Sequence, residues 1–131
     1  ERAESAAKQA VLGSPRSADT LYLMAEAQLR LARRTVKPKV RARLLQEGRW
    51  VAEQGLRIRR EMPTLLLTHG MAMLEQAKQL TGPEERAELA GRAQADIDRA
   101  LSFNPTLRRD HARVLDEAKA LRARSVSHGE N

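Results

Sequence analysis

The chain has 131 residues, a net charge of +7 and an isoelectric point near 10.7, and its residues are 41% hydrophobic and 31% charged. It contains no cysteine, which excludes disulfide bonds and thiolate metal sites, and no stretch approaches the roughly 18 apolar residues of a membrane span. The length suits one domain with one continuous core, and no signal peptide is visible, so we expect a single cytoplasmic domain.

Strong helix formers dominate the composition, and β-branched residues never alternate over the length of a strand. The sequence therefore predicts an all-α fold of about six helices. The first helix ends at Gly13, Ser14 and Pro15, because a terminal glycine and a following proline stop a helix. The second runs from about Ser17, a suitable N-cap, to Val36.

The third helix is predicted over residues 38–61, and it carries Gly48 and Gly55 beside its apolar stripe. Glycine inside a helix costs about 1 kcal/mol relative to alanine, so two of them indicate that a neighbouring helix approaches closely. The fourth helix is predicted over residues 63–80, because Pro63 fits the first turn of a helix.

The fifth helix is predicted over residues 83–103, where two acids in the first turn suit the positive end of the helix dipole. A sixth helix opens at Pro105 and extends to about Arg124. We expect residues 125–131 to form a flexible tail, so that residues 1–124 make up the domain.

One spacing of small and apolar residues, with gaps of four, three and five, ends in a proline twice in the chain. The two sets are Ala3, Ala7, Ala10 and Pro15, and Ala93, Ile97, Ala100 and Pro105. Residues at i, i+4 and i+7 share one face of a helix, so small ones let a neighbouring helix come close. Because Pro15, Pro63 and Pro105 each open a helix, at separations of 48 and 42 residues, we expect antiparallel hairpins that stack.

This pattern resembles the tetratricopeptide repeat, whose second helix carries a small residue, a large apolar residue, alanine and proline at these offsets. The resemblance covers residues 1 to about 124 and implies a right-handed superhelix of stacked hairpins that binds polypeptides. The separations exceed the family's period of about 34 residues, which implies elongated helices. The run ALSFNPTLRRDHARVLDEAKAL also resembles tails attached to bacterial serine/threonine protein kinases.

In the tetratricopeptide family the first helix of each pair lines a concave binding surface, and the resemblance carries that role to three sets of residues. They are Tyr22, Glu26, Leu29 and Arg30, then Leu67, Gly70, Leu74 and Lys78, then Arg109, Ala112, Asp116 and Lys119. The carboxylate clamp of chaperone-binding relatives is not implied, because other residues occupy its Lys and Asn positions. Core packing is the alternative interpretation of Leu67 and Leu74, since elongated helices can rotate them inward.

Positive charge is concentrated between Arg30 and Arg60, where eleven Lys or Arg residues accompany two acids, Glu47 and Glu53. The basic patch consists of Arg33, Arg34, Lys37, Lys39, Arg41, Arg43, Arg49, Arg57, Arg59 and Arg60. Three interpretations are open: a solvated helix face that also contacts acids elsewhere, a site for an acidic protein partner, and a site for nucleic acid or anionic lipid. The last is the least favoured, because nucleic-acid modules usually add aromatic stacking, and Trp50 alone does not supply it.

The remaining titratable residues form no catalytic pattern. His69 and His111 fall on equivalent positions of two repeats and are interpreted as packing residues, because no spacing brings three or four metal ligands together. Asp96 and Asp98 lie on different faces of one helix and are interpreted as solvated surface. There is neither a nucleophile elbow nor a phosphate-binding loop, so we expect no enzymatic activity and no cofactor.

Two functions of different class remain. The first is a protein-interaction module, part of a larger bacterial signalling protein, that binds a peptide segment or partner domain in a mixed apolar and basic groove. The second is a structural spacer or self-association element without a peptide ligand. Binding of nucleic acid through the basic third helix is a weaker third alternative.

Overall fold

The computed structural model describes residues 17–129, and within that range the side chains of residues 17–126. The predicted first helix, with Ala3, Ala7, Ala10 and Pro15, lies outside the described residues. All five described elements are helices and the described range contains no strand, which confirms the all-α prediction. They are α2 (Ala18–Arg34), α3 (Pro38–Ile58), α4 (Pro63–Gln79), α5 (Pro83–Phe103) and α6 (Thr106–Gly129).

Local signals set most of the helix boundaries. Ser17 caps α2, and its Oγ accepts a backbone hydrogen bond at 3.2 Å. Pro38, Pro63 and Pro83 open α3, α4 and α5 as predicted, since proline needs no donor in the first turn of a helix. Three helices end before their predicted ends: α3 at Ile58, three residues early, α2 at Arg34, two residues early, and α4 at Gln79, one residue early.

The last helix is longer than predicted. α6 continues to Gly129, past the expected end near Arg124, so the first residues of the expected tail are helical. Ser125 is buried, its Oγ donates to the backbone carbonyl of Leu121 at 2.7 Å, and it accepts from Arg86 Nε at 2.8 Å. These contacts tie the last turns of α6 to α5, which explains why the helix does not stop earlier.

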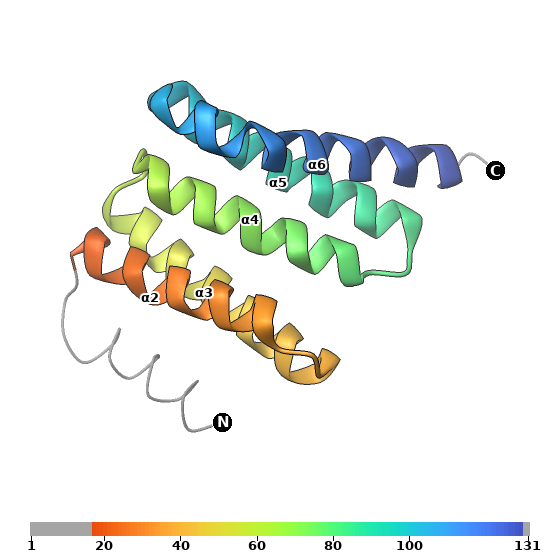
Figure 1. The fold of residues 1–131 in the computed structure, drawn as a ribbon, viewed down its shortest axis with the longest axis horizontal. Coiled ribbons are helices and arrows are strands. Elements are labelled where there is room, and N and C mark those ends of the chain that lie inside the picture. Colours follow the sequence, from red (N-terminus) through yellow and green to blue (C-terminus); the bar gives the residue numbers. More distant parts are fainter. Residues whose placement is uncertain (1–16, 130–131) are drawn as a thin grey trace.

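The helices form two layers that run in opposite directions (Figure 1). α2, α4 and α6 lie side by side in one layer, and α3 and α5 lie behind them in the other. Each helix packs against the next one in sequence, α2 also contacts α4, and α4 contacts α6. Successive helices are therefore antiparallel, and the chain advances along the stack from the hairpin of α2 and α3 to α6.

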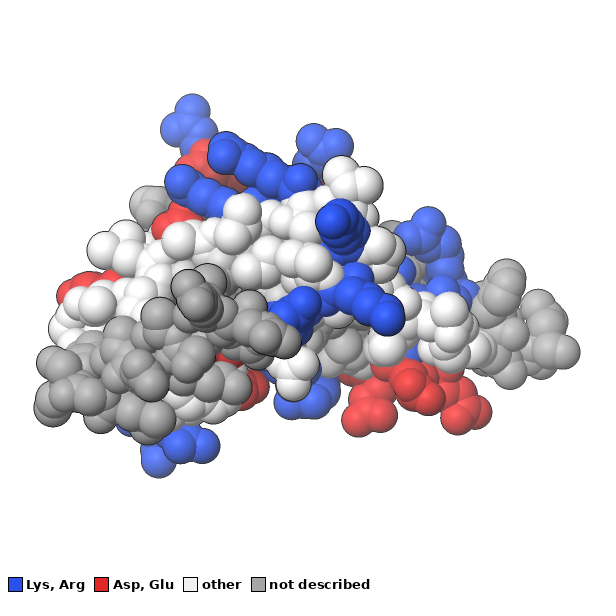
Figure 2. All heavy atoms as spheres, turned by 90° about the horizontal axis from the view of Figure 1, so that it is seen from below, with Lys and Arg blue, Asp and Glu red and all other residues white. Residues whose placement is uncertain are grey.

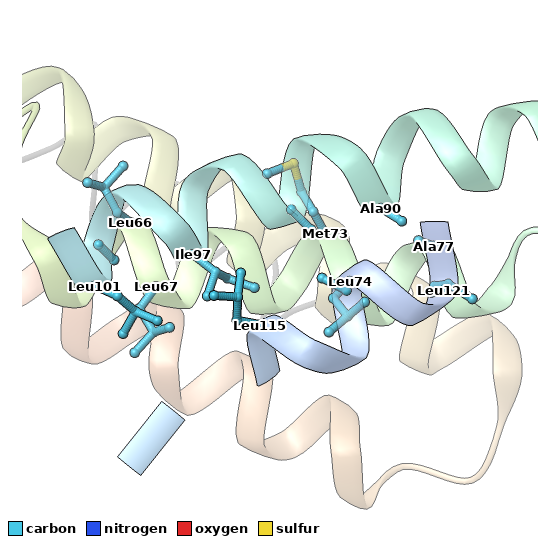
Figure 3. Packing of buried hydrophobic residues seen from close by; sticks show 13 residues of the cluster. Leu66, Leu67, Met73, Leu74, Ala77, Ala90, Ile97, Leu101, Leu115 and Leu121 are labelled. Carbon is cyan, nitrogen blue, oxygen red and sulfur yellow. The ribbon is translucent and has the colours of Figure 1, made fainter. Parts of the chain in front are cut away.

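The core lies between the two layers, and its largest cluster joins α4, α5 and α6 (Figure 3). Ala93, Ile97 and Ala100, the small and apolar positions of the predicted repeat, are completely buried in this cluster. A second cluster, which includes Leu21 and Leu65, joins α2 and α3 to the start of α4, and a smaller third cluster lies between the same helices. α4 contributes to all three clusters, so it is the central element of the stack.

Gly48 and Gly55 lie where α3 approaches its neighbours, as their positions predict. A Cβ at Gly48 would lie 3.4 Å from the Cβ of Gln28 in α2, an ordinary contact distance at its lower limit. A Cβ at Gly55 would lie only 2.7 Å from Cδ1 of Leu65 in α4. The close packing of α3 against α4 therefore depends on Gly55 having no side chain, whereas a methyl group at Gly48 would be in ordinary contact with α2.

Candidate functional site

A cleft of about 180 Å³ lies on the layer formed by α2, α4 and α6. It is lined by Tyr22, Glu26, Leu29, Arg30, Arg33, Thr64, Leu67, Thr68, Met71, Leu107 and His111. Pockets that hold drug-sized ligands usually measure at least about 300 Å³, so this cleft suits a side chain of a partner better than a cofactor.

Helical periodicity brings the lining residues onto one face of each helix. On α2 they recur every three or four residues from Tyr22 to Arg33, and on α4 they recur in the same way from Thr64 to Met71. α6 contributes its first turns, through the lining residues nearest its start. Because α2, α4 and α6 lie in one layer, the three faces open toward the same side (Figure 1).

The cleft has an apolar floor and a basic rim. Leu29 and Leu67 belong to the floor and are buried, with 3% and 5% of their surfaces exposed. At the rim, Arg30 Nη2 lies 2.7 Å from Glu26 Oε1 in an ion pair within α2. Arg33 is exposed and makes no ion pair with any other described residue. The cleft can therefore hold an apolar side chain and offers an uncompensated cation beside it.

Tyr22 adds a hydrogen-bonding group to the cleft. Partial burial raises the pKa of its hydroxyl above the ordinary value of 10.0, and the neighbouring carboxylate of Glu26 raises it further. The hydroxyl therefore stays protonated at neutral pH with its proton directed toward Glu26, and its oxygen can accept a hydrogen bond from a bound partner.

Five of the twelve predicted groove residues come together in the cleft: Tyr22, Glu26, Leu29, Arg30 and Leu67. Gly70 and Leu74 do not line it, which corrects the expected lining from α4. Leu74 is 1% exposed within the largest core cluster, and a Cβ at Gly70 would lie 2.8 Å from Cγ1 of Ile97 in α5. The reason is that α4 packs on both sides, so a residue on its predicted open face can still meet α5.

The other predicted groove residues lie outside the cleft. Lys78 Nζ bridges Glu75 Oε2 at 3.0 Å and Glu117 Oε2 at 3.2 Å, which joins α4 to α6. Burial by itself lowers the pKa of Lys78, but these two carboxylates outweigh it and leave the pKa raised. Arg109 lines a shallow depression beside the first turn of α6. The remaining three are exposed on α6: Ala112, Asp116 and Lys119.

The basic patch divides into paired and unpaired cations. Arg41 lies 3.2 Å from Glu75, Arg49 lies 3.4 Å from Glu53, and Arg59 lies 3.9 Å from Asp19. These contacts fit the interpretation of the patch as a solvated helix face that also contacts acidic residues. The others are exposed and make no ion pair within the described residues: Arg33, Arg34, Lys37, Lys39, Arg43, Arg57 and Arg60. Figure 2 views the stack from the side of α2 and α3 and shows the Lys and Arg side chains in separate groups.

His69 is buried between two carboxylates from different helices. Its Nε2 lies 3.0 Å from Glu53 Oε2 in α3, and its Nδ1 contacts Asp96 Oδ2 in α5. Since a carboxylate can only accept, both contacts together require a proton on each ring nitrogen, so they stabilise the imidazolium form of the ring. Burial by itself lowers the pKa of His69, but the hydrogen bonds and charges of Asp96 and Glu53 outweigh it and leave the pKa above its ordinary value of 6.5. We call these three residues the histidine triad.

The histidine triad corrects one interpretation and refines another. His69 packs in the interior, as predicted, but as a charged residue that connects three helices. Asp96 was interpreted as solvated surface, whereas its side chain is only 24% exposed and contacts the ring. His111, assigned to the equivalent position, lines the cleft instead.

Several cleft residues were not predicted from the sequence: Arg33, Thr64, Thr68, Met71, Leu107 and His111. Helical spacing from Leu67 indicates Thr64 and Met71, but it also indicates Gly70, which lies against α5 instead, so the lining from α4 does not follow from spacing alone. The contribution of α6 could not be predicted either, since it depends on how α6 sits relative to α2 and α4.

The arrangement shows no metal centre within the described residues, where no three His, Asp or Glu side chains are placed to hold an ion. None of the described helices combines the length and apolar character that crossing a bilayer requires. No protein-family model matches the chain, and neither the curated proteins nor the solved structures contain a significant match. The function is therefore inferred from the geometry of the cleft.

Proposed function

We propose that this chain is a tetratricopeptide-like interaction domain of a larger bacterial signalling protein, and that it binds a polypeptide segment or partner domain in the cleft. The observation that carries the proposal is the cleft itself, where three helices of one layer present a continuous face with an apolar floor and a basic rim. Its volume of about 180 Å³ suits an inserted side chain.

Stacking as a right-handed superhelix of hairpins belongs to the same proposal. It is supported by the contacts of α2 with α4 and of α4 with α6, which repeat along one layer. It is also supported by Ala93 and Ala100, which are buried at the small positions of the family's pattern. A stack of this type leaves one face of its first helices open for binding, because each hairpin contacts only its neighbours.

A library of displayed random peptides, sorted against the whole chain, tests this function without a known partner. The blocking variant is Thr64→Trp, because Thr64 is half-buried at the cleft and its side chain makes no hydrogen bond with any described residue. The matched control is Thr81→Trp, which places the same ring on an exposed turn away from the cleft. We expect enriched peptides to bind Thr64→Trp at least about tenfold more weakly than Thr81→Trp, a loss of about 1.4 kcal/mol.

Two results would contradict the proposal. One is that no peptide is enriched above a display without the domain. The other is that enriched peptides bind both tryptophan variants equally while both retain the melting temperature of the wild type, since the cleft would then play no part in binding.

Self-association is a second candidate function, and it has an observation of its own. Leu23 and Leu31 lie eight residues apart on α2 and remain 62% and 53% exposed. Two leucines at this spacing share one helix face, which a second copy could cover. This function requires a concentration-dependent dimer in light scattering that disappears in Leu23→Glu with Leu31→Glu. A monomer at all concentrations would dismiss it.

A further inference from the structure

We propose that the partner is an acidic polypeptide segment, which inserts an apolar side chain into the cleft and lays its carboxylates along the turn between α2 and α3. We call the exposed cations of this turn the cationic turn: Arg33, Arg34, Lys37, Lys39 and Arg43. The inference rests on the proposed function, since it names the chemistry of the partner that the cleft would bind.

The ion pairs of the described fold do not use the cationic turn, although Arg33 and Arg34 lie in the last turn of α2, where positive charge suits the helix dipole. Arg41 and Arg49, in the same helix, each meet a carboxylate of the chain at 3.2 Å and 3.4 Å. No member of the cationic turn makes an ion pair with a described residue, and all five are exposed. Their positive potential therefore reaches solvent without local compensation, which favours an anionic partner.

Part of this charge also opposes the stability of α3. Lys37 is the N-cap residue, makes no side-chain capping hydrogen bond, and Lys39 follows in the first turn, where there is no acid. Positive charge at the positive end of a helix dipole is unfavourable. α2 and α5 do the opposite, with Asp19 in the first turn of α2 and two acids in that of α5. A bound carboxylate would remove this repulsion, so the charge placement fits a binding role.

Arg33 belongs to both the cleft and the cationic turn, so the two features are continuous. From Leu29 on the cleft floor to Arg34 at the end of α2 the helix advances five residues, which is about 7.5 Å at the helical rise of 1.5 Å per residue, and Lys37 follows three extended residues later. An extended peptide covers about 3.3–3.6 Å per residue. The carboxylates should therefore begin within about four residues of the apolar side chain that enters the cleft.

A polypeptide fits the two features better than a phosphate polymer or a membrane does. Only a polypeptide offers an apolar side chain and carboxylates at this spacing within one segment. Single-stranded nucleic acid usually adds stacking on aromatic rings, and the cationic turn contains none. Val36 at the tip is 91% exposed and could touch a lipid surface, but such contact would leave the cleft unused.

The test uses the whole chain, the displayed peptide library and two charge-reversed variants. The turn variant is Lys37→Glu with Lys39→Glu and Arg43→Glu, which leaves every residue of the cleft unchanged. The control variant reverses three exposed cations away from the cleft, Arg57, Arg60 and Arg92, so both variants change the net charge equally. Acids at the start of α3 suit its dipole, so the turn variant should fold at least as well as the wild type.

We expect enriched peptides to carry an apolar residue with Asp or Glu within about four positions, on the spacing argument above. They should bind the turn variant about tenfold more weakly or worse, and the control variant within about threefold, because several close opposite charges are lost only in the first. Two results would overturn the inference and leave the proposed function standing. In the first, peptides that bind Thr64→Trp more weakly contain no Asp or Glu. In the second, such peptides bind the turn variant and the control variant equally tightly. No cleft-dependent peptide at all would overturn both.

Two further probes separate the remaining partners. A 20-nucleotide thymidine strand and vesicles of phosphatidylserine mixed with phosphatidylcholine are titrated at low salt against the wild type and the turn variant. The inference is overturned if the wild type binds either probe, the turn variant does not, and no acidic peptide is enriched. The cationic turn would then be assigned to binding phosphate groups. Failure of both probes alongside acidic peptides supports it.

Discussion

The histidine triad and the cationic turn both include charged residues of α3, and they are arranged in opposite ways. In the triad, an imidazolium that is 10% exposed is flanked by carboxylates from two other helices. In the turn, five exposed cations make no ion pair with a carboxylate of the described residues. The same helix therefore contributes to charge that is satisfied internally in the triad and to charge left for solvent or a partner in the turn.

The difference shows how to separate structural charge from binding charge in this domain. A buried charge must be paired, because the free-energy cost of removing it from water is offset only by nearby opposite charges and hydrogen bonds. An exposed charge is under no such constraint, so its arrangement can serve binding. Changes in the triad should therefore alter stability, and changes in the turn should alter binding with little loss of stability.

The largest expected effect is that of His69→Leu. The substitution leaves Glu53 and Asp96 without the cation between them. We expect the free energy of unfolding to fall by about 2–3 kcal/mol. This is less than the loss for a fully buried ion pair, because both carboxylates are partly exposed. Urea denaturation measures it. The control is His111→Leu at the cleft, which should change stability by less than about 1 kcal/mol. Equal losses in the two variants would remove the triad from the stabilising contacts.

The second effect tests how closely α4 and α5 approach beside the triad. Gly70→Ala places a Cβ 2.8 Å from Cγ1 of Ile97 and 3.1 Å from the carbonyl oxygen of Ala93, so we expect a loss of about 1–2 kcal/mol from overpacking. Gly91→Ala in α5 is the control, because its Cβ meets only the Arg122 side chain at 3.6 Å. The control should gain up to about 1 kcal/mol from helix propensity. Thermal unfolding of the two variants decides, and a gain at both positions would mean that α4 and α5 lie further apart.

The third effect is the pH dependence that the triad confers. The folded chain holds the pKa of His69 above its ordinary value of 6.5, so the folded state binds the proton more tightly than the unfolded state. The stabilisation is therefore complete below about pH 6.5 and is lost as the pH rises through the folded value. Denaturation midpoints taken from pH 6 to pH 9 should fall in the wild type and fall less in His69→Leu. Parallel curves for the two proteins would contradict the assignment of the imidazolium.

The contrast also explains what the sequence could and could not predict. The starts of α3, α4 and α5 follow from Pro38, Pro63 and Pro83, whose effect is local. The triad joins residues 16 and 27 positions apart along the chain, so no local pattern indicates it. Each of these prolines acts within the helix that it starts, whereas the triad requires residues from three helices.

The predicted groove shows the same limit. The lining from α2 could be predicted, because Tyr22 to Arg30 occupy one face of a helix with one open side. α4 is different, since it is buried against neighbours on both sides and even a three-residue step, from Leu67 to Gly70, moves from the cleft to the contact with α5. Which face of a central helix stays open is decided by its neighbours and not by its own sequence.

The smallest effect is the most specific to the cationic turn. Lys39→Glu replaces a cation with an acid in the first turn of α3, where the helix dipole favours negative charge, so we expect a gain of about 0.3–1 kcal/mol in the free energy of unfolding. The matched control is Arg57→Glu in the last turn of the same helix, where the same change of charge opposes the dipole and should destabilise by a similar amount.

Both variants are measured by urea denaturation at low and high salt, because screening should shrink the two effects together. A loss of stability in Lys39→Glu would show that this lysine has a structural partner. The turn would then resemble the triad, and its charges could no longer be assigned to binding on the ground that the fold does not use them.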